Sequence, residues 1–177
     1  MKRSSLVIGT LGVLVLWICA WLFFPPVVSS NARIPNSADA IARGEYLVIA
    51  GGCISCHRSV EDEVSFAGGL GIETEFGTFY APNITPDIET GIGSWSPQDF
   101  LRALKHGRTP TGNFYYPTFP YRAYARLIEQ DVLDMAAYLL SLEPVSYQAP
   151  EPEVPRWLFR WTIAGWNRLA DLSQAER

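Results

Sequence analysis

GGCISCHR, residues 51–58, is the stretch that decides how the rest of this chain is interpreted. Within it, Cys53, Cys56 and His57 form the pattern Cys-x-x-Cys-His, the attachment signature of a c-type haem. Two thiols one helical turn apart can add to the two vinyl groups of one macrocycle, and the adjacent imidazole then lies beneath the iron. The pattern predicts one covalent haem c, with thioether links at Cys53 and Cys56 and with His57 as the proximal iron ligand.

Two other uses of the cysteine pair fit the sequence less well. A thioredoxin-like dithiol needs a βαβ context, whereas the residues before Cys53 are typical of a helix. A zinc site needs further cysteine or histidine ligands at close spacing, and His106 is the only other histidine. The sequence therefore favours haem over a redox dithiol or a zinc ion.

The residues around this motif predict a mainly α fold with long loops. Ser37 is suited to cap a helix over about 38–49, and Ser96 one over about 97–106 that ends at Gly107. A third helix is expected over about 129–142, ended by Pro144. The segment GIETEFGTFY, residues 71–80, predicts a small hairpin.

An uncharged run of nineteen residues, LVIGTLGVLVLWICAWLFF, occupies positions 6–24. As a helix it would be about 28 Å long, close to the ~30 Å hydrocarbon core of a bilayer. Lys2 and Arg3 precede it, which predicts a cytoplasmic start and a single transmembrane helix within an anchor at 1–28. The rival interpretation is a cleaved signal peptide, but the apolar run is longer than the apolar region of a typical signal peptide. Under either interpretation the chain from about residue 29 is exported to the bacterial periplasm.

Composition excludes several classes of protein. The 177 residues are 48% hydrophobic with a net charge of −4, which is typical of a folded chain and not of a nucleic-acid binder. Three cysteines are too few for a disulfide scaffold.

We expect a mono-haem domain at 32–148, followed at 149–177 by a Pro/Glu linker and a Trp-rich amphipathic tail. That tail suits either the membrane interface or packing against protein.

Acidic and basic residues are separated along the chain. Residues 61–89 contain seven acids and no lysine or arginine, whereas residues 102–126 contain five basic residues and no acid. Such separation would orient a redox partner during docking, although it is equally compatible with an ordinary soluble surface. Some of the arginines are alternatively suited to hold haem propionates.

Four segments carry a resemblance to a known family: GEYLVIAGGCISCH, FAGGLGIETEFGTFYAPNITPDIETGIGSWSPQDFLRALKHG, YYPTFPY and DVLDMAAYLLSLEPV. Over about residues 43–145 the chain resembles the membrane-associated c-type cytochrome subunits of bacterial periplasmic dehydrogenases, such as those of alcohol, gluconate and aldehyde dehydrogenases. The resemblance implies a cytochrome c fold and electron transfer from a partner enzyme toward a quinone or terminal oxidase.

One position departs from the family pattern. Many relatives have a methionine in the loop before the last helix that binds iron opposite the histidine, and here the corresponding residue is Phe119. His106 and Met135 are weak candidates for the distal ligand. His106 stands at the expected end of a helix, where a capping or solvated histidine is common, and Met135 lies in the last helix, where core packing explains a methionine equally well. Without the thioether we expect a lower reduction potential or a high-spin component.

The sequence thus predicts an electron-transfer protein and not an enzyme. It is expected to be held in the inner membrane, with the cytochrome domain in the periplasm. Its expected partners are a dehydrogenase or another redox subunit, the membrane, and a quinone pool, terminal oxidase or soluble cytochrome as acceptor. The alternative is a haem-based gas-binding or sensor protein with an open distal site at Phe119.

Overall fold

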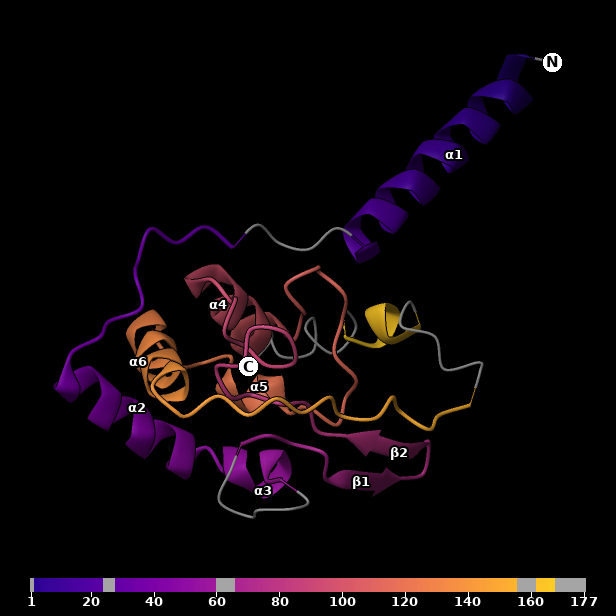
Figure 1. Ribbon diagram of the computed structural model, residues 1–177. Helices are drawn as coiled ribbons and strands as arrows, with labels where there is room; N and C mark the ends of the chain where they lie inside the picture. Colours follow the sequence, from indigo (N-terminus) through magenta and orange to yellow (C-terminus); the bar gives the residue numbers. More distant parts are fainter. Residues whose placement is uncertain (1, 24–27, 60–65, 156–161, 168–177) are drawn as a thin grey trace. The chain divides into compact units, whose positions relative to one another are not determined.

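The computed structural model describes residues 2–23, 28–59, 66–155 and 162–167. The chain divides into two compact units, Val28–Trp157 and a second unit made of Met1–Val27 and Leu158–Arg177. The first unit contains the haem-attachment motif and nearly all of the described secondary structure (Figure 1). The predicted tail helix falls mostly outside the described residues, and 162–167 are helical.

The second unit begins with helix α1, Lys2–Phe23. Over the part of the chain that is described, no helix combines the length and the apolar character that crossing a membrane requires. The predicted N-terminal transmembrane helix is therefore wrong by this test.

Helix α2, Ala38–Ala50, begins where the sequence predicted. The Ser37 side chain accepts a hydrogen bond from the backbone N–H of Ala40 and so satisfies one of the free donors at the helix start. At the other end, the backbone N–H of Gly51 donates to the carbonyl of Leu47 at 2.8 Å. The helix therefore delivers the chain directly into the motif at residue 53.

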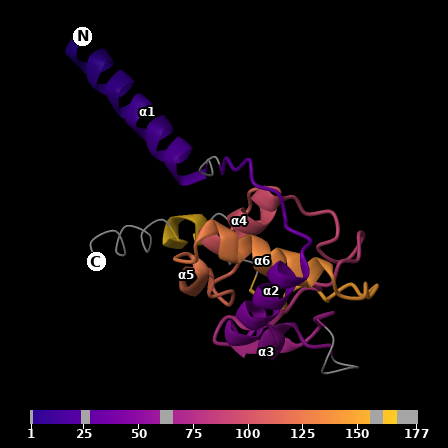
Figure 2. The same ribbon diagram turned by 90° about the vertical axis from the view of Figure 1, so that its left-hand side faces the viewer.

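Helices α2 and α6, Glu129–Leu140, pack against each other (Figure 1 and Figure 2). Gly44 makes a close approach possible, because a β-carbon there would lie 1.9 Å from the backbone oxygen of Asp134. The Asp134 carboxylate is buried and accepts from Arg43 Nε at 2.7 Å. The hydrophobic core between the helices and loops consists of Val48, Phe66, Ile92, Phe100, Leu101, Val132, Met135, Ala136 and Leu139.

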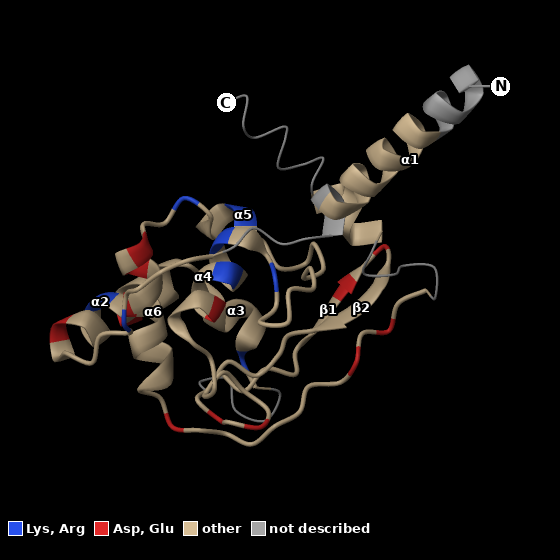
Figure 3. Ribbon diagram, turned by 90° about the horizontal axis from the view of Figure 1, so that it is seen from above, with Lys and Arg blue, Asp and Glu red and all other residues tan. Residues whose placement is uncertain are grey.

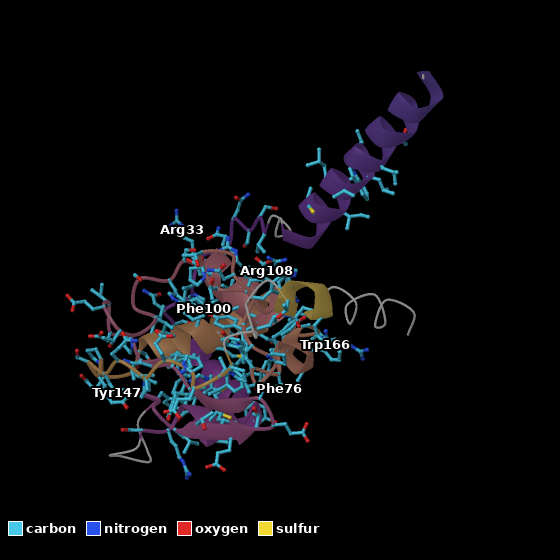
Figure 4. All side chains as sticks on the ribbon, turned by 90° about the vertical axis from the view of Figure 1, so that its right-hand side faces the viewer. Arg33, Phe76, Phe100, Arg108, Tyr147 and Trp166 are labelled. Atoms are coloured by element: carbon cyan, nitrogen blue, oxygen red, sulfur yellow. The ribbon has the colours of Figure 1, made fainter. Side chains whose placement is uncertain are left out.

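Helix α4, Pro97–His106, has both ends defined by the residues that the sequence indicated. Ser96 and Asp99 form a capping box, in which each side chain accepts a hydrogen bond from the other residue's backbone N–H. The helix ends at Gly107, whose φ of 61° is readily adopted by glycine. Its apolar side reaches the core through Phe100, which is labelled in Figure 4.

The predicted hairpin is confirmed as strands β1, Gly71–Thr74, and β2, Gly77–Tyr80, which pair antiparallel. The Pro/Glu segment expected to be a linker lies along β2, where the backbones of Glu153 and Thr78 exchange two hydrogen bonds. The prediction of a mainly helical domain with a small hairpin is correct for this unit.

Candidate haem-attachment site

Helix α3, Cys53–His57, is a single short turn that follows α2 almost directly. Its N-cap, Gly52, has a φ of 70°, a conformation that a residue with a β-carbon rarely adopts. Cys53 and Cys56 are three residues apart on this turn, and both are half-buried free thiols. Burial raises the pKa of the Cys53 thiol to about 11. The turn therefore holds the two thiols one helical turn apart, as attachment to one macrocycle requires.

The His57 ring is held in one orientation by a residue from a distant loop. Its Nδ1 lies 2.8 Å from the carbonyl oxygen of Pro82. A carbonyl can only accept, so Nδ1 carries the proton and the Nε2 lone pair remains available for a metal. Burial lowers the pKa of His57 and so favours the neutral ring, although the bond to Pro82 acts in the opposite direction. Metal-binding histidines commonly donate their second N–H to a carbonyl in this way.

Pro82 reaches His57 because two loop segments run side by side. The backbone N–H of Gly69 donates to the carbonyl of Ala81 at 2.8 Å, and that of Gly68 donates to the carbonyl of His57 at 2.9 Å. Gly68 has a φ of 78°, and a β-carbon there would lie 2.4 Å from the Ala81 oxygen. At the neighbouring Gly69, a β-carbon would lie 2.7 Å from the hydroxyl oxygen of Tyr147, which is labelled in Figure 4. These glycines allow the close backbone approach that orients the imidazole.

Asn83 fixes the same loop from its other side. Its buried side chain donates to the carbonyl of Val145 at 2.7 Å, and its Oδ1 accepts from both the backbone N–H and the hydroxyl of Thr85. Sequence reasoning missed Pro82, Asn83 and Thr85 as supports of the site. The available signal was the run of turn-forming residues in PNITPDIETGIG, where asparagine and aspartate side chains bind nearby backbone.

Aromatic side chains pack against one another in the loop that contains Phe119. Phe119 packs edge-on against Tyr115, with ring centroids 5.3 Å apart, and stacks on Tyr124 at 6.0 Å. Helix α5, Tyr121–Tyr124, follows directly, and the Tyr124 hydroxyl donates to the carbonyl of Gly51 at 2.8 Å. Sequence reasoning did not single out Tyr124, which connects this loop to the residues preceding Cys53.

The two weak candidates for a distal ligand lie on different helices. Met135 is only 2% exposed and belongs to the core of α6 beside Val132 and Leu139, so core packing accounts for it. His106 is the half-buried last residue of α4, immediately before Gly107. A role for His106 in ligation stays a prediction.

Several basic residues of segment 102–126 serve the fold itself. Arg108 is buried, with its guanidinium 3.6 Å from the centre of the Phe114 ring and donating to the Gly112 carbonyl (Figure 4). Arg102 pairs with Asp99. In the ribbon of Figure 3, which is coloured by charge, basic positions occur on α4 and α5 and acidic positions occur on β1 and along the loops. Of the acidic segment, residues 61–63 lie outside the described residues.

The arrangement of Cys53, Cys56 and His57 fits a covalently held haem. Two thiols on one turn would carry the vinyl links, and His57 presents its unprotonated Nε2 for the iron. Within the described ranges, no group of three or more histidine, cysteine or acidic residues is placed to hold a metal ion. The roles of the three residues stay predictions that the geometry accommodates.

Comparison with known proteins agrees with this geometry. Residues 41–143, which include most of α2, the attachment turn, the hairpin and α6, match the family described as Cytochrome c. The chain belongs to the cytochrome c family. Members of that family hold haem c covalently, so the predicted class of cofactor is confirmed for this cytochrome, whereas the number of haems is not.

Relatives of this cytochrome include dehydrogenase subunits. It is 40% identical over 95% of its length to a diheme cytochrome c-type protein of Cereibacter sphaeroides, and spans 58% of that protein. It is 42% identical over 72% of its length to the gluconate 2-dehydrogenase cytochrome c subunit of Pantoea cypripedii, spanning 29% of it. The alcohol dehydrogenase (quinone) cytochrome c subunit of Gluconobacter oxydans is 38% identical over 80% of the chain, which spans 30% of it. The predicted resemblance to dehydrogenase cytochrome subunits is therefore confirmed.

Proposed function

We propose that this cytochrome transfers single electrons between a dehydrogenase and a respiratory chain, through one haem c attached at Cys53 and Cys56. The observation that carries the proposal is the turn Cys53–His57, in which the thiols lie one turn apart and Pro82 fixes the imidazole. The bound haem would supply a one-electron Fe(III)/Fe(II) step. The polypeptide would bind the haem through Cys53 and Cys56, and the Pro82 carbonyl orients His57.

A dehydrogenase is the partner that the relatives favour, since their names describe cytochrome subunits of gluconate and alcohol dehydrogenases. This chain would then be the electron-transfer component and not the catalytic subunit. A quinone pool, a terminal oxidase or a soluble cytochrome would accept the electron. We place the cytochrome unit in the bacterial periplasm, because Lys2 and Arg3 precede an apolar run that is typical of exported chains.

The second candidate function is ligand binding at a haem whose distal side lacks a thioether. Its support is Phe119, which stands where relatives have methionine and which packs between Tyr115 and Tyr124. Fast carbon monoxide binding to the reduced protein, with slow electron exchange, would favour this function. Slow binding with fast electron exchange would favour the electron carrier.

The test is covalent attachment of haem in the matured full chain. We expect acid-acetone to leave the pigment on the wild-type protein, and the intact mass to exceed that of the polypeptide by one haem. Cys53→Ser and Cys56→Ser should each leave a single thioether and shift the haemochrome spectrum, and the double variant should release the pigment. Ser55→Ala, at the exposed position between the two cysteines, is the matched control and should retain it. Clean extraction of haem from the wild-type protein would disprove the proposal.

A further inference from the structure

Tyr124 contacts the backbone immediately before the attachment turn. Its hydroxyl donates to the carbonyl of Gly51 at 2.8 Å, a bond between residues 73 positions apart in the chain. Gly51 is the C-cap of α2 and stands two residues before Cys53. A β-carbon on Gly51 would lie 3.4 Å from Cε1 of Tyr124, so the phenol ring rests directly against this backbone.

The same ring supports the loop that contains Phe119. The Phe119 and Tyr124 rings are 28° from parallel, with centroids 6.0 Å apart. Tyr115 packs edge-on against Phe119 at 5.3 Å. The backbone between these rings is also tightly turned, because Phe119 donates to the carbonyl of Tyr116 and Tyr121 donates to the carbonyl of Phe119. Tyr124 therefore joins the aromatic loop to the turn that carries both thiols.

The Tyr124 hydroxyl is the donor in this bond, because a carbonyl oxygen can only accept and a phenol of ordinary pKa is protonated at neutral pH. Burial raises the pKa of Tyr124 further.

We propose that Tyr124 is a positioning residue for the haem, which sets the separation between the attachment turn and the Phe119 loop and thereby restricts entry of small ligands. This inference rests on the proposed function, since it concerns a haem held at Cys53 and Cys56. Two independent contacts carry it: the hydroxyl bond to Gly51 on one side and the stacked Phe119 ring on the other.

The experiment compares holoprotein variants that remove these contacts in steps. Tyr124→Phe keeps the ring and its stacking on Phe119 but loses the hydroxyl bond, whereas Tyr124→Ala loses both. Tyr80→Phe is the matched control, because it loses a hydroxyl bond of the same 2.8 Å length, to Glu153 beside the hairpin. For each protein we would measure the carbon monoxide association rate of the reduced haem, the midpoint potential, the Soret spectrum and the melting temperature.

We expect carbon monoxide to bind Tyr124→Phe about 2- to 10-fold faster than wild type, the range that loss of one ordinary hydrogen bond corresponds to. The potential and Soret band should shift as well, and Tyr124→Ala should show larger changes in each. Tyr80→Phe should match the wild type in rate, potential and spectrum, even where its melting temperature falls.

The outcomes separate this inference from the proposed function. Covalent haem with wild-type ligand kinetics, potential and spectrum in Tyr124→Phe would overturn the role of Tyr124 and leave the electron-transfer proposal standing. Equal changes in Tyr124→Phe and Tyr80→Phe would also overturn it, because they would reflect general loosening. Absence of covalent haem from the wild-type protein would instead refute the proposed function. Should Tyr124→Ala fail to fold, Tyr124→Phe alone decides the question.

Discussion

Gly44 of α2 and Asp134 of α6 meet backbone to backbone, since a β-carbon on Gly44 would lie 1.9 Å from the Asp134 carbonyl oxygen. We predict that Gly44→Ala pushes the two helices apart and lowers the free energy of unfolding by about 1–3 kcal/mol or more. Urea unfolding of the holoprotein measures this. Gly165→Ala is the control, because a β-carbon there would have no atom within 4 Å, and its free energy of unfolding should stay within about 0.5 kcal/mol of the wild-type value. Equal stability of the two variants would contradict the close helix contact.

Asn83→Ala should destabilise the loop that orients His57. The substitution removes the acceptor of the Thr85 backbone N–H and hydroxyl, and it removes the amide donor to the Val145 carbonyl, so that only the longer 3.4 Å bond from the Thr85 hydroxyl to that carbonyl remains. We expect a loss of about 1–3 kcal/mol in the free energy of unfolding. Asn113→Ala, which removes an exposed amide, is the control and should have little effect. A neutral result for Asn83→Ala would show that the loop does not depend on this side chain.

Asp87 makes a contribution to stability that depends on pH. Hydrogen bonds from the Thr90 hydroxyl, and then from backbone N–H groups of Thr90 and Glu89, lower the pKa of the Asp87 carboxyl. A lowered folded-state pKa stabilises the protein above the unfolded value of about 3.9, and this stabilisation is lost as the pH falls through the folded value. We predict that the wild type exceeds Asp87→Asn in urea midpoint near neutral pH, and that the difference shrinks on acidification below about pH 4. A difference that stays constant or grows would contradict this.

Phe119→Met should supply the axial thioether that the family resemblance leads us to expect at this position. We expect the midpoint potential to rise, by tens to hundreds of millivolts within the about 0.8 V that axial ligands span, and a sulfur-to-iron charge-transfer band to appear in the oxidised spectrum. Phe76→Met makes the same change at a half-exposed hairpin position and should leave the spectrum unaltered. A wild-type protein that already shows the band, or a variant that lacks it, would count against this role for residue 119.

Local patterns predicted much of the fold. The caps Ser37 and Ser96 and the glycine at 107 mark helix ends through bonds to neighbouring residues, so α2 and α4 could be placed closely from the sequence. The hairpin at 71–80 could be predicted for the same reason, because its two strands pair within ten consecutive residues. The attachment residues Cys53, Cys56 and His57 could be predicted because haem attachment requires this spacing, and their roles stay predictions. The transmembrane helix, inferred from apolar length alone, is the prediction that the structure contradicts.

The contacts that complete the site join distant parts of the chain. His57 binds the carbonyl of Pro82, 25 residues away, and Tyr124 binds that of Gly51, 73 residues away. A backbone carbonyl carries no side-chain signal, and the loops that bring these groups together have no periodicity. Such contacts follow from tertiary packing. The turn-forming residues of PNITPDIETGIG indicate an ordered loop, but they do not indicate which distant residue the loop contacts.

The pairing of Glu153 with Thr78 also bears on self-association of this cytochrome. An unpaired strand edge is a template on which a second molecule can add its own strand. Glu153 occupies part of the β2 edge, and Gly77 permits its approach, because a β-carbon there would lie 2.0 Å from the Glu153 oxygen. The segment around Glu153 thus covers part of the β2 edge. A chain truncated before Glu153 would expose the backbone groups of this edge, and we expect it to aggregate by edge-to-edge strand pairing.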